Sequence, residues 1–371
     1  ELIIQKCKVD LSTTTLKRFF GTVNHSGSPS TTTLDTLSQY VGHENWRSFK
    51  LASKDVPWLS NFQLPSKGLY LSIGFVVAFL VIVLIGTKRP QESPNLESLS
   101  FSSRPVTNSF PNSVVFDFDL KGIDVENMRI QQYWDPEKTI SISKDQKQAT
   151  GIYYFPGYFR ARLMIGSDTA SQHDLFLRSN GWLGTIDYSP IPKYFTPASS
   201  AETAMTLPQS LTEEIEASKD GETSTYHYVN DLGNVDGDNF QLDATIKVDY
   251  TEKWAVCQRA LVYVLGSKSA LIIPFSKIGC SSDNWLMLSD NYLDGKQNDL
   301  SVFGCDLSQF TDVSISANDK NVVISIAGAE VYQNSYTKTI GRIVGLRFKF
   351  LGYGEVKTFS LLNQTGTEVI L

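Results

Sequence analysis

A run of hydroxyl and basic side chains near the amino terminus has residue types that can contact nucleic acid. The set comprises Ser12, Thr13, Thr14, Lys17 and Arg18. These residues open the block STTTLKRFFG, whose periodicity is helical, and polar residues at the start of such a helix can face the major groove of DNA. The alternative is a helical bundle that binds a protein or only folds, with both basic side chains as solvated surface.

Aromatic side chains further along the chain supply a second candidate chemistry, stacking against a sugar ring. Tyr154, Tyr158 and Trp182 are the candidate ligand-binding residues, and Tyr153 lies beside them in the sequence. In a β-sandwich, however, such side chains more often fill the core. The nearby His173 has no second His or Cys close to it in sequence with which to bind a metal ion.

Carboxylates at spacings that bind metal ions or catalyse reactions would supply a third chemistry. Asp236 and Asp238 in NVDGDN have a type that attracts calcium, but their spacing does not complete a calcium-binding loop. We expect a turn there, before a strand that starts at Phe240. The sequence contains no nucleophile elbow, phosphate-binding loop or two-histidine zinc motif. These patterns predict no catalytic residue, no metal and no cofactor, and they lean against an enzyme without excluding one.

One apolar stretch divides the chain. Residues 68–87, GLYLSIGFVVAFLVIVLIGT, contain no charge and are apolar on all faces. As a helix this stretch is roughly 30 Å long, which matches the hydrocarbon thickness of a bilayer. We therefore expect a single transmembrane helix, with membrane lipid as a partner and Lys67, Lys88 and Arg89 as interfacial anchors. The alternative is a buried hairpin or core helix of a soluble domain. Basic residues are balanced on the two sides, so charge gives no orientation.

Composition and cysteine usage limit the remaining possibilities. The chain has 371 residues, is 41% apolar and carries a net charge of −6, so it can hold two or three domains and is not basic overall. Cys7 precedes the apolar stretch, whereas Cys257, Cys280 and Cys305 follow it. The latter three would face an oxidising periplasm, where at most one disulfide can form among them. The sequence does not decide the pair, although Cys280 with Cys305 is one choice.

Short helical blocks separated by turns occupy residues 1–55. Ser12 precedes one block and can cap it, and Thr32 followed by Asp35 gives the next a start that resembles a capping box. Gly42 then ends that block. We expect the apolar residues of these blocks to share one small core: Leu16, Phe19, Phe20, Leu34, Leu37, Tyr40, Val41, Trp46 and Phe49.

This amino-terminal segment resembles known helix-turn-helix modules. STTTLKRFFG followed by SPSTTTLDTLSQYVG is similar to lambda-repressor-like modules, in which an apolar third helix follows the second. The signatures TLKRFFG, TLDTLSQYVG and ENWRSF look still more like a module at the amino terminus of many membrane-anchored Bacteroidetes proteins. The turn at Lys8, Val9 and Asp10 departs from the pattern because it contains no Gly. The resemblance implies DNA contact on a cytoplasmic side of the membrane.

Alternating apolar and polar residues characterise the chain beyond residue 112. Val114, Phe116, Phe118 and Leu120 form one strand face. The stretch GIYYFPGYFRARLMIG followed by HDLFLRS resembles the last strands of polycystic-kidney-disease-type (PKD) immunoglobulin-like domains. The alternation predicts a sandwich of about seventy residues, and the resemblance implies that it is a spacer or a weak binding module.

A second alternating region begins at Phe240, with Leu242, Ala244 and Ile246 on the same face. The segments VDGDNFQLDATI, VVISIAGAEVYQ and IGRIVGLRFKFLGYGEVKTFSL resemble concanavalin A-like lectin and glucanase domains, which are jelly-roll sandwiches. Glucanases of this kind place two or three carboxylates on one strand with a Glu-x-Asp-x-x-Glu spacing. No strand here carries that set.

The expected fold class is a multidomain protein with a small all-α domain, one transmembrane helix, an all-β immunoglobulin-like sandwich and an all-β jelly-roll sandwich. The expected boundaries are 1–55 for the helix-turn-helix-like domain, 68–87 for the transmembrane helix, 88–111 for a linker, 112–182 for the PKD-like sandwich, 183–226 for a connecting segment and 227–371 for the concanavalin A-like domain.

Two functions follow from this organisation. The first is a single-pass inner-membrane sensor of signalling type, with periplasmic β-domains that bind a ligand such as a glycan and a cytoplasmic module that binds DNA or a protein. A single helix transmits most readily through oligomerisation, so a homo-oligomer is a candidate state. The alternative is a membrane-tethered glycan-binding or glycan-processing surface protein whose helical module is an assembly element.

Overall fold

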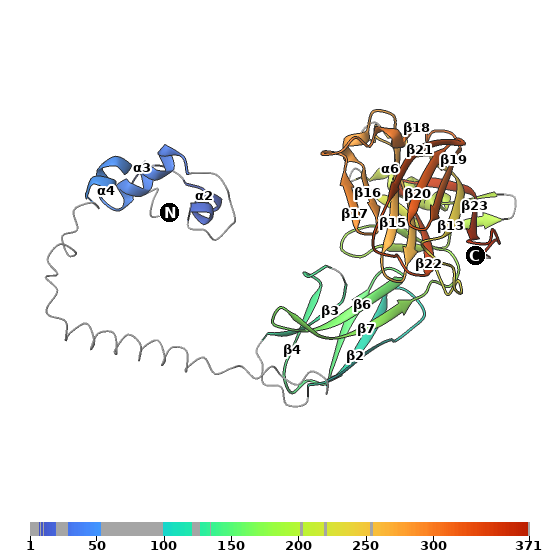
Figure 1. The fold of residues 1–371 in the computed structure, drawn as a ribbon, viewed down its shortest axis with the longest axis horizontal. Helices are drawn as coiled ribbons and strands as arrows, with labels where there is room; N and C mark the ends of the chain where they lie inside the picture. The colour runs from blue at the N-terminus through green and yellow to red at the C-terminus, as the bar shows by residue number, and fades with distance from the viewer. Residues whose placement is uncertain are drawn as a thin grey trace. The chain divides into compact units, whose positions relative to one another are not determined.

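The computed structural model describes residues 7, 9, 11–19, 29–52, 99–120, 127–133, 135–200, 203–218, 221–252 and 255–369. The chain divides into two compact units, Glu1–Gln91 and Glu92–Leu371. In the first unit the described elements are helices, and in the second they are mainly strands (Figure 1). The expected transmembrane stretch, 68–87, lies outside the described residues. None of the helices in the described ranges has the length and hydrophobicity of a membrane span.

Three short helices are described in the first unit: α2 (Thr13–Phe19), α3 (Thr31–Tyr40) and α4 (Trp46–Ala52). Ser12 caps α2 as predicted, because its Oγ accepts a hydrogen bond from the Thr15 amide at 3.1 Å. The cap of α3 is Ser30, which accepts from the Thr33 amide at 3.2 Å, so the expected start at Thr32 is wrong.

Asp35 caps a different helix from the one expected. Its Oδ1 accepts from the Trp46 amide at 2.8 Å, so this carboxylate caps the first turn of α4 instead of closing a capping box in α3. Gly42 follows α3 with a φ of 94°, and the amide of His43 donates to the carbonyl of Ser38 at 2.9 Å. The predicted glycine stop is therefore confirmed.

The buried face of α3 is polar. Thr33, Thr36 and Ser38 are its buried residues, whereas Leu34 and Leu37 are only half-buried. The hydroxyls of Thr36 and Ser38 each donate to the carbonyl four residues earlier, at 2.8 Å, so they can be buried without a distant partner. The expectation of one shared apolar core in the amino-terminal segment is not supported by the described residues.

A smaller β-sandwich begins the second unit. One sheet has the order β1-β2-β5 and the other β4-β3-β6-β7, with all pairs antiparallel. The strands are β1 (Ser100–Pro105), β2 (Asn112–Asp119), β3 (Met128–Gln131), β4 (Thr139–Ile142), β5 (Gln148–Tyr153), β6 (Gly157–Ile165) and β7 (Asp168–Leu177). The alternation of Val114, Phe116 and Phe118 is confirmed, since all three are buried in its core. Strand β1 lies within the stretch expected to be a linker, and Phe101 from it joins the same core.

A larger β-sandwich follows, built from a seven-stranded and a nine-stranded sheet. The seven-stranded order is β10 (Ala198–Ser200), β11 (Thr203–Thr206), β23 (Gly354–Asn363), β13 (Phe240–Val248), β19 (Thr311–Asn318), β20 (Asn321–Ile326) and β21 (Ala329–Ser335). The nine-stranded path is β17 (Asn291–Asp294), β16 (Trp285–Leu288), β15 (Ala270–Lys277), β14 (Arg259–Gly266), β22 (Ile343–Leu351), β12 (Thr223–Val229), β8 (Leu183–Ile186) and β9 (Lys193–Phe195). Strand β18 (Gly304–Cys305) joins β15 in parallel.

The segment expected to connect the two β-domains belongs to the larger sandwich. Residues 183–226 contribute β8 to β11, the helix α6 (Gln209–Ala217) and the start of β12. Ile186, Met205 and Ile215 are buried in the same core as β13. The prolines in this segment lie in turns between short strands. The prediction of an irregular connection was wrong because several prolines close together are also typical of a segment without strands.

Alternation along β13 decides which way the seven-stranded sheet faces. Leu242, Ala244 and Ile246 are buried in the core, as predicted, while Asp243 and Thr245 between them are partly exposed. The predicted hairpin over VVISIAGAEVYQ is also confirmed, with Ile326 paired to Ala329 around a two-residue turn. Both turn residues have positive φ, which is typical of a type I′ hairpin. The all-β sandwich expected here is therefore present.

Candidate functional site

The outer face of the seven-stranded sheet carries a row of small polar side chains across four neighbouring strands. Backbone register places Asp243 of β13 between Ser360 of β23 and Ser314 of β19, and Ser314 beside Ser325 of β20. Each of these residues alternates with core residues along its own strand, so the row faces away from the core. The sheet thus aligns hydroxyls and a carboxylate from distant parts of the sequence.

A second row lies beside the first and is tied together by hydrogen bonds. Thr245 pairs with Thr358 on one side and with Asp312 on the other. The Thr245 hydroxyl lies 2.6 Å from Asp312 Oδ1 and 2.9 Å from the Thr358 hydroxyl. Because a hydroxyl has one proton and the carboxylate can only accept, Thr245 donates to Asp312 and accepts from Thr358.

The two rows line a groove of about 390 Å³. Its lining residues are Asp243, Ala244, Thr245, Asp312, Val313, Ser314, Ser325, Gly328, Thr358, Phe359 and Ser360. Gln241 donates to Asp243 Oδ2 at 2.7 Å, and an ionised carboxylate has about four acceptor positions, so Asp243 can accept further donors. Carboxylates and hydroxyls in a shallow groove are suited to bind a ligand that carries many hydroxyls.

An exposed aromatic ring lies along the same sheet face. Lys247 follows Thr245 on that face of β13, and its Nζ lies 5.5 Å from the centroid of the Phe310 ring. Lys357 approaches the same ring at 5.4 Å. The side chain of Phe310 is 40% exposed, so its ring offers an apolar surface against which a sugar ring can stack.

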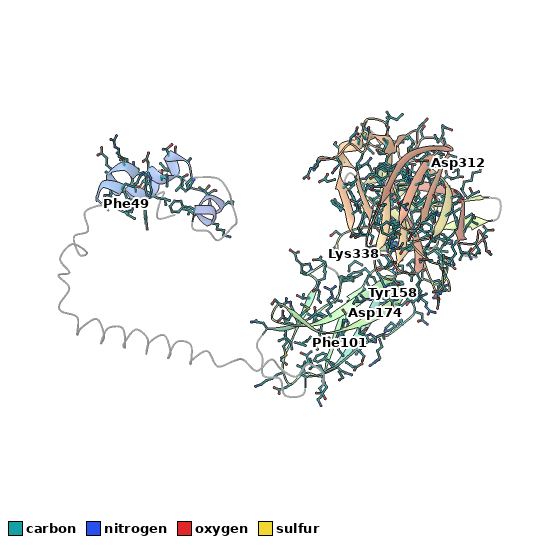
Figure 2. The ribbon with its side chains drawn as sticks, viewed as in Figure 1. Phe49, Phe101, Tyr158, Asp174, Asp312 and Lys338 are labelled. Atoms are coloured by element: carbon teal, nitrogen blue, oxygen red, sulfur yellow. A yellow bond between two sulfur atoms is a disulfide. The ribbon has the colours of Figure 1, made fainter. Side chains whose placement is uncertain are left out.

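The predicted aromatic residues occupy different environments from the groove. Trp182 is partly buried against the core of the larger sandwich, where its ring lies 5.1 Å from Phe359 and 5.3 Å from Tyr228. Tyr158 and Asp174 belong to the smaller sandwich (Figure 2). The Tyr158 hydroxyl donates to Asp174 at 3.0 Å. Tyr154 is half-buried beside Tyr153, which is fully buried. Phe359 also lines the groove, so Trp182, which contacts Phe359, supports the floor of the groove from the inner side of the sheet.

The residues predicted to contact DNA are described in part. Ser12, Thr14 and Lys17 are exposed on or beside α2, while the side chains of Thr13 and Arg18 lie outside the described set. DNA contact by this helix therefore remains a prediction.

The two candidate calcium ligands serve the turn before β13, as predicted. Asp236 accepts from the amide of Asp238 at 3.0 Å and from Asn239 Nδ2 at 2.8 Å. Asp238 is buried and accepts from the Tyr336 hydroxyl at 2.8 Å. Both carboxylates thus have protein donors, and among the described residues no cluster of three potential metal ligands forms.

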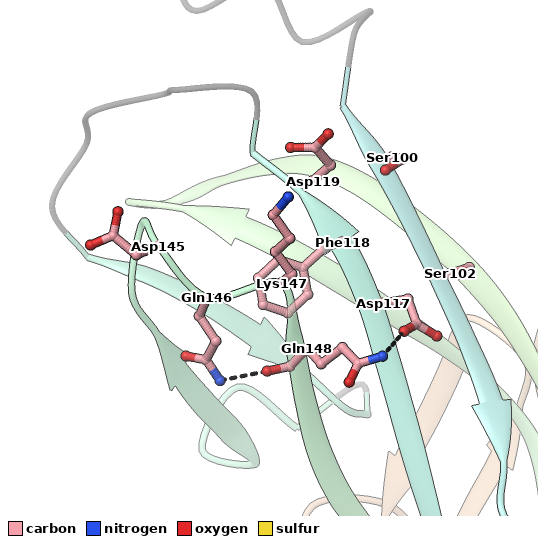
Figure 3. Close-up of a pocket in the computed structure, with 9 residues that line it drawn as sticks. All are labelled: Ser100, Ser102, Asp117, Phe118, Asp119, Asp145, Gln146, Lys147 and Gln148. Atoms are coloured by element: carbon pink, nitrogen blue, oxygen red, sulfur yellow. Dashed lines mark hydrogen bonds between the residues drawn. The ribbon is translucent and has the colours of Figure 1, made fainter.

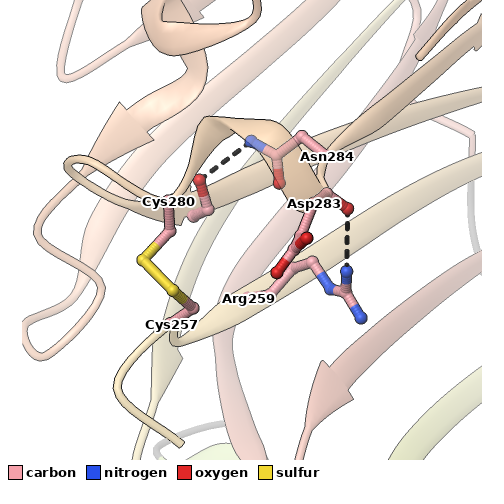
Figure 4. Close-up of a disulfide and its surroundings, with 6 residues drawn as sticks. Cys257, Arg259, Cys280, Asp283 and Asn284 are labelled. Carbon is pink, nitrogen blue, oxygen red and sulfur yellow. Dashed lines mark hydrogen bonds between the residues drawn. A yellow bond between two sulfur atoms is a disulfide. The ribbon is translucent and has the colours of Figure 1, made fainter. Parts of the chain in front are cut away.

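A disulfide joins Cys257 to Cys280, with their Cα atoms 5.6 Å apart (Figure 4). The pairing of Cys280 with Cys305 is therefore wrong, although a single bridge among the three cysteines was predicted correctly. Cys305 is buried, and burial raises the pKa of its thiol to about 11. Figure 4 shows the bridge beside Arg259, which donates to the carbonyl of Asp283 at 3.0 Å.

A larger open groove, of about 730 Å³, lies on the smaller sandwich between β1, β2 and the β4–β5 turn (Figure 3). Its carboxylates include Asp117, Asp119 and Asp145. Asp117 is already engaged by Gln148 at 2.5 Å and by Arg104 at 3.2 Å.

The fold and the groove define a class: antiparallel β-sandwich proteins with a polar groove on one outer sheet face. A scan against models of protein families finds no match, and a search of curated proteins finds none either.

Solved structures that superpose on part of the chain include alginate lyase AlyC3 in complex with dimannuronate, with 10% identity, a TM-score of 0.31 and coverage of 49% of this chain and 90% of that one. Domain 4 of AbnA, an extracellular arabinanase from Geobacillus stearothermophilus, in complex with arabinotriose, has 11% identity, a TM-score of 0.28 and coverage of 51% and 84%. Carbohydrate binding module CBM66 from Bacillus subtilis has 9% identity, a TM-score of 0.29 and coverage of 49% and 94%. Likenesses this distant do not assign a function.

Proposed function

We propose that the larger sandwich binds a glycan in the groove on the outer face of its seven-stranded sheet. The observation that supports this proposal is the alignment of two carboxylates and five hydroxyls, from four strands, around one groove. Sugar hydroxyls donate to carboxylates, and they both donate to and accept from Ser and Thr hydroxyls. The exposed Phe310 ring adds a stacking surface along the same face.

The proposal extends to the compartment and the attachment of the protein. A disulfide between Cys257 and Cys280 supports an oxidising location for the sandwiches, such as the periplasm or the cell surface. The apolar stretch 68–87 would then tether them to the membrane. A glycan-binding surface protein is favoured here over a DNA-binding sensor, because the groove brings carboxylates and hydroxyls together on one face, where they can bind a ligand with many hydroxyls.

The test is a glycan array on the full chain in detergent, followed by calorimetric titration with the best ligand. We expect Asp243→Asn and Asp312→Asn each to weaken binding by about tenfold, because each change removes a charge-assisted hydrogen bond. The matched control is Asp319→Asn, since Asp319 has a side chain that is 89% exposed and does not line the groove.

Two outcomes would contradict the proposal: no glycan bound by the wild type, or equal affinities for all four proteins. Incubation of the same glycans with the chain also separates binding from processing. Release of shorter saccharides would assign the two groove carboxylates to catalysis and replace binding by an enzymatic function.

A further inference from the structure

The outer face of the nine-stranded sheet carries a second polar row, on three adjacent strands. His227 of β12 pairs with Arg347 of β22, which in turn pairs with Tyr263 of β14. The neighbouring strand positions Tyr226 and Phe348 are buried in the core of the larger sandwich. The row therefore lies on the opposite face from that core.

Arg347 has no carboxylate partner among the described residues. Its Nη2 donates to the carbonyl of Pro156 at 3.1 Å, and its guanidinium lies 5.5 Å from the centre of the Tyr263 ring. Its Nε is buried and has no hydrogen-bond partner in the described part of the chain. A guanidinium has five N–H donors in a planar fork that matches a carboxylate, so most of this donor capacity is unused by the protein.

The carboxylate of Asp187 interacts with Arg347 electrostatically, but its hydrogen bonds go to other donors. Asp187 Oδ2 accepts from Lys349 Nζ at 2.8 Å. Three hydroxyls also donate to Asp187: those of Thr185 at 2.7 Å, Thr223 at 3.0 Å and Thr225 at 2.9 Å. Three of these four donors bind Oδ2, and Thr185 binds Oδ1. Asp187 therefore pairs directly with Lys349, and it acts on the charge of Arg347 only at a distance, without a hydrogen bond.

The hydrogen-bond chain to Asp187 also fixes the tautomer of His227. The Thr185 hydroxyl donates its one proton to Asp187, so it must accept from His227 Nε2, which lies 2.9 Å away. Burial and the nearby charges of Arg347 and Lys349 hold the pKa of His227 well below its usual value, so the ring is neutral. Its proton is then on Nε2, and Nδ1 is a bare acceptor. Nδ1 is buried and has no partner among the described residues.

One turn of the smaller sandwich covers both groups. Between β5 and β6, the Phe155 ring lies 5.7 Å from the ring of His227, and the Pro156 carbonyl accepts from Arg347. This carbonyl oxygen occupies a position that an oxygen of a ligand carboxylate would take. The turn is held on its other side by Tyr194, whose hydroxyl donates to the carbonyl of Tyr154 at 2.8 Å.

We propose that Arg347 and His227 form a binding site for a hydroxy acid, free or as a sugar-acid unit of a glycan, which displaces the covering turn at Phe155 and Pro156. Arg347 binds the carboxylate, and His227 Nδ1 accepts from the neighbouring hydroxyl of the ligand. Arg347 Nε thus gains an acceptor oxygen, and His227 Nδ1 gains a hydroxyl donor. The site is independent of the groove on the seven-stranded sheet, because it lies on the other sheet.

The test is calorimetric titration of the full chain with D-glucuronate, tetragalacturonate, sodium sulfate and D-glucose. We expect both sugar acids to bind, sulfate to bind at least tenfold more weakly and glucose not to bind. Arg347→Met should weaken glucuronate binding at least tenfold, and Phe155→Ala should tighten it severalfold by removing the cover. The matched control is Arg160→Met, since Arg160 is already paired with Asp174 at 2.6 Å and should not contribute.

A spectroscopic measurement keeps the test independent of how the variants fold. The chain has four histidines, and ¹⁵N labelling of their rings allows His227 Nδ1 to be assigned from its loss in His227→Gln. Glucuronate should shift this resonance and sulfate should not. The proposal is overturned if neither the wild type nor Phe155→Ala binds glucuronate, if Arg347→Met binds it equally well, or if sulfate binds as tightly with the same shift. A preference for tetragalacturonate over glucuronate would assign the site to a glycan unit, and equal affinities to the free hydroxy acid.

Discussion

At the scale of single residues, the groove consists of small polar side chains whose function depends on their neighbours across the sheet. Asp243 and Asp312 are 69 positions apart in the sequence, but they lie on adjacent strands. A search for carboxylates spaced along one strand cannot find such a pair. The useful signal is the alternation of Asp and Thr with buried residues along β13, which predicts a polar outer face but not the strand that lies beside it.

Both the backbone conformation at position 352 and the side chain packed against it are expected to require glycine there. Its φ is 68°, and an added Cβ would lie 2.1 Å from Cγ of the Tyr250 ring. Gly352→Ala should therefore lower the free energy of unfolding by more than the about 1–2 kcal/mol that a left-handed backbone costs. The control is Gly366→Ala, where φ is 74° but nothing lies within 4 Å. Urea denaturation should rank the two variants in this order, and equal losses would contradict the stated role of Tyr250.

At the scale of elements, the disulfide holds together the outer ends of one hairpin. Cys257 lies just before β14, and Cys280 lies just after β15, and these two strands pair along their length. The bridge closes a loop with a sequence separation of 23 residues. For a loop of this size the chain-entropy model gives a stabilisation on the order of 3 kcal/mol.

Removing the bridge should therefore destabilise the larger sandwich by roughly that amount. We expect Cys257→Ala with Cys280→Ala, and equally the wild type in reducing agent, to lose on the order of 3 kcal/mol in urea denaturation. The double variant should be insensitive to reducing agent. Cys305→Ala is the control, because its buried thiol is unbonded and this variant should respond to reduction as the wild type does. A wild type that does not respond to reduction would exclude the bridge.

At the scale of the whole molecule, stability is expected to depend on the charge state of His227. This residue is buried and neutral, with its pKa held well below 6.5 by burial and by Arg347 and Lys349. As pH falls below 6.5, the unfolded chain binds a proton at this position that the folded chain does not. Stability should then fall by up to about 1.4 kcal/mol per pH unit, since each proton taken up only on unfolding contributes that slope.

Thermal unfolding between pH 7 and pH 5 measures this effect, and His227→Gln should flatten the slope. Carboxylates whose pKa is lowered in the folded protein also make the protein less stable in acid. Asp174 is one of them, and the chief cause of its lowered pKa is the hydrogen bond from Arg160. They contribute mainly at lower pH, because carboxyl groups of the unfolded chain take up protons near pH 4. A slope unchanged in His227→Gln would show that another group is responsible.

Membrane attachment is a property of the whole chain that the described residues do not test. We expect the full chain to partition into the detergent phase of a phase-separation assay and a variant lacking 68–87 to remain in the aqueous phase. If the full chain stays in the aqueous phase, the apolar stretch is buried in a soluble fold. Protease accessibility in spheroplasts would then show on which side the sandwiches lie.

The sequence by itself determined the element type wherever a strand has one buried and one exposed face. Alternation in β2 and β13 and the hairpin β20–β21 were read correctly, because side chains of a strand point to opposite faces with a period of two. Local hydrogen bonds such as the Ser12 cap were also predictable, because both partners lie within one turn.

Only the tertiary structure decided which strands are neighbours, and the groove, the disulfide pair and the row of His227 and Arg347 all depend on that order. Strands that are far apart in sequence, such as β12 and β22, become neighbours through packing of the whole core. The sequence of either strand alone does not indicate which strand pairs with it. The short strands of residues 183–226 were missed for the same reason, since their pairing partners and not their own composition make them strands.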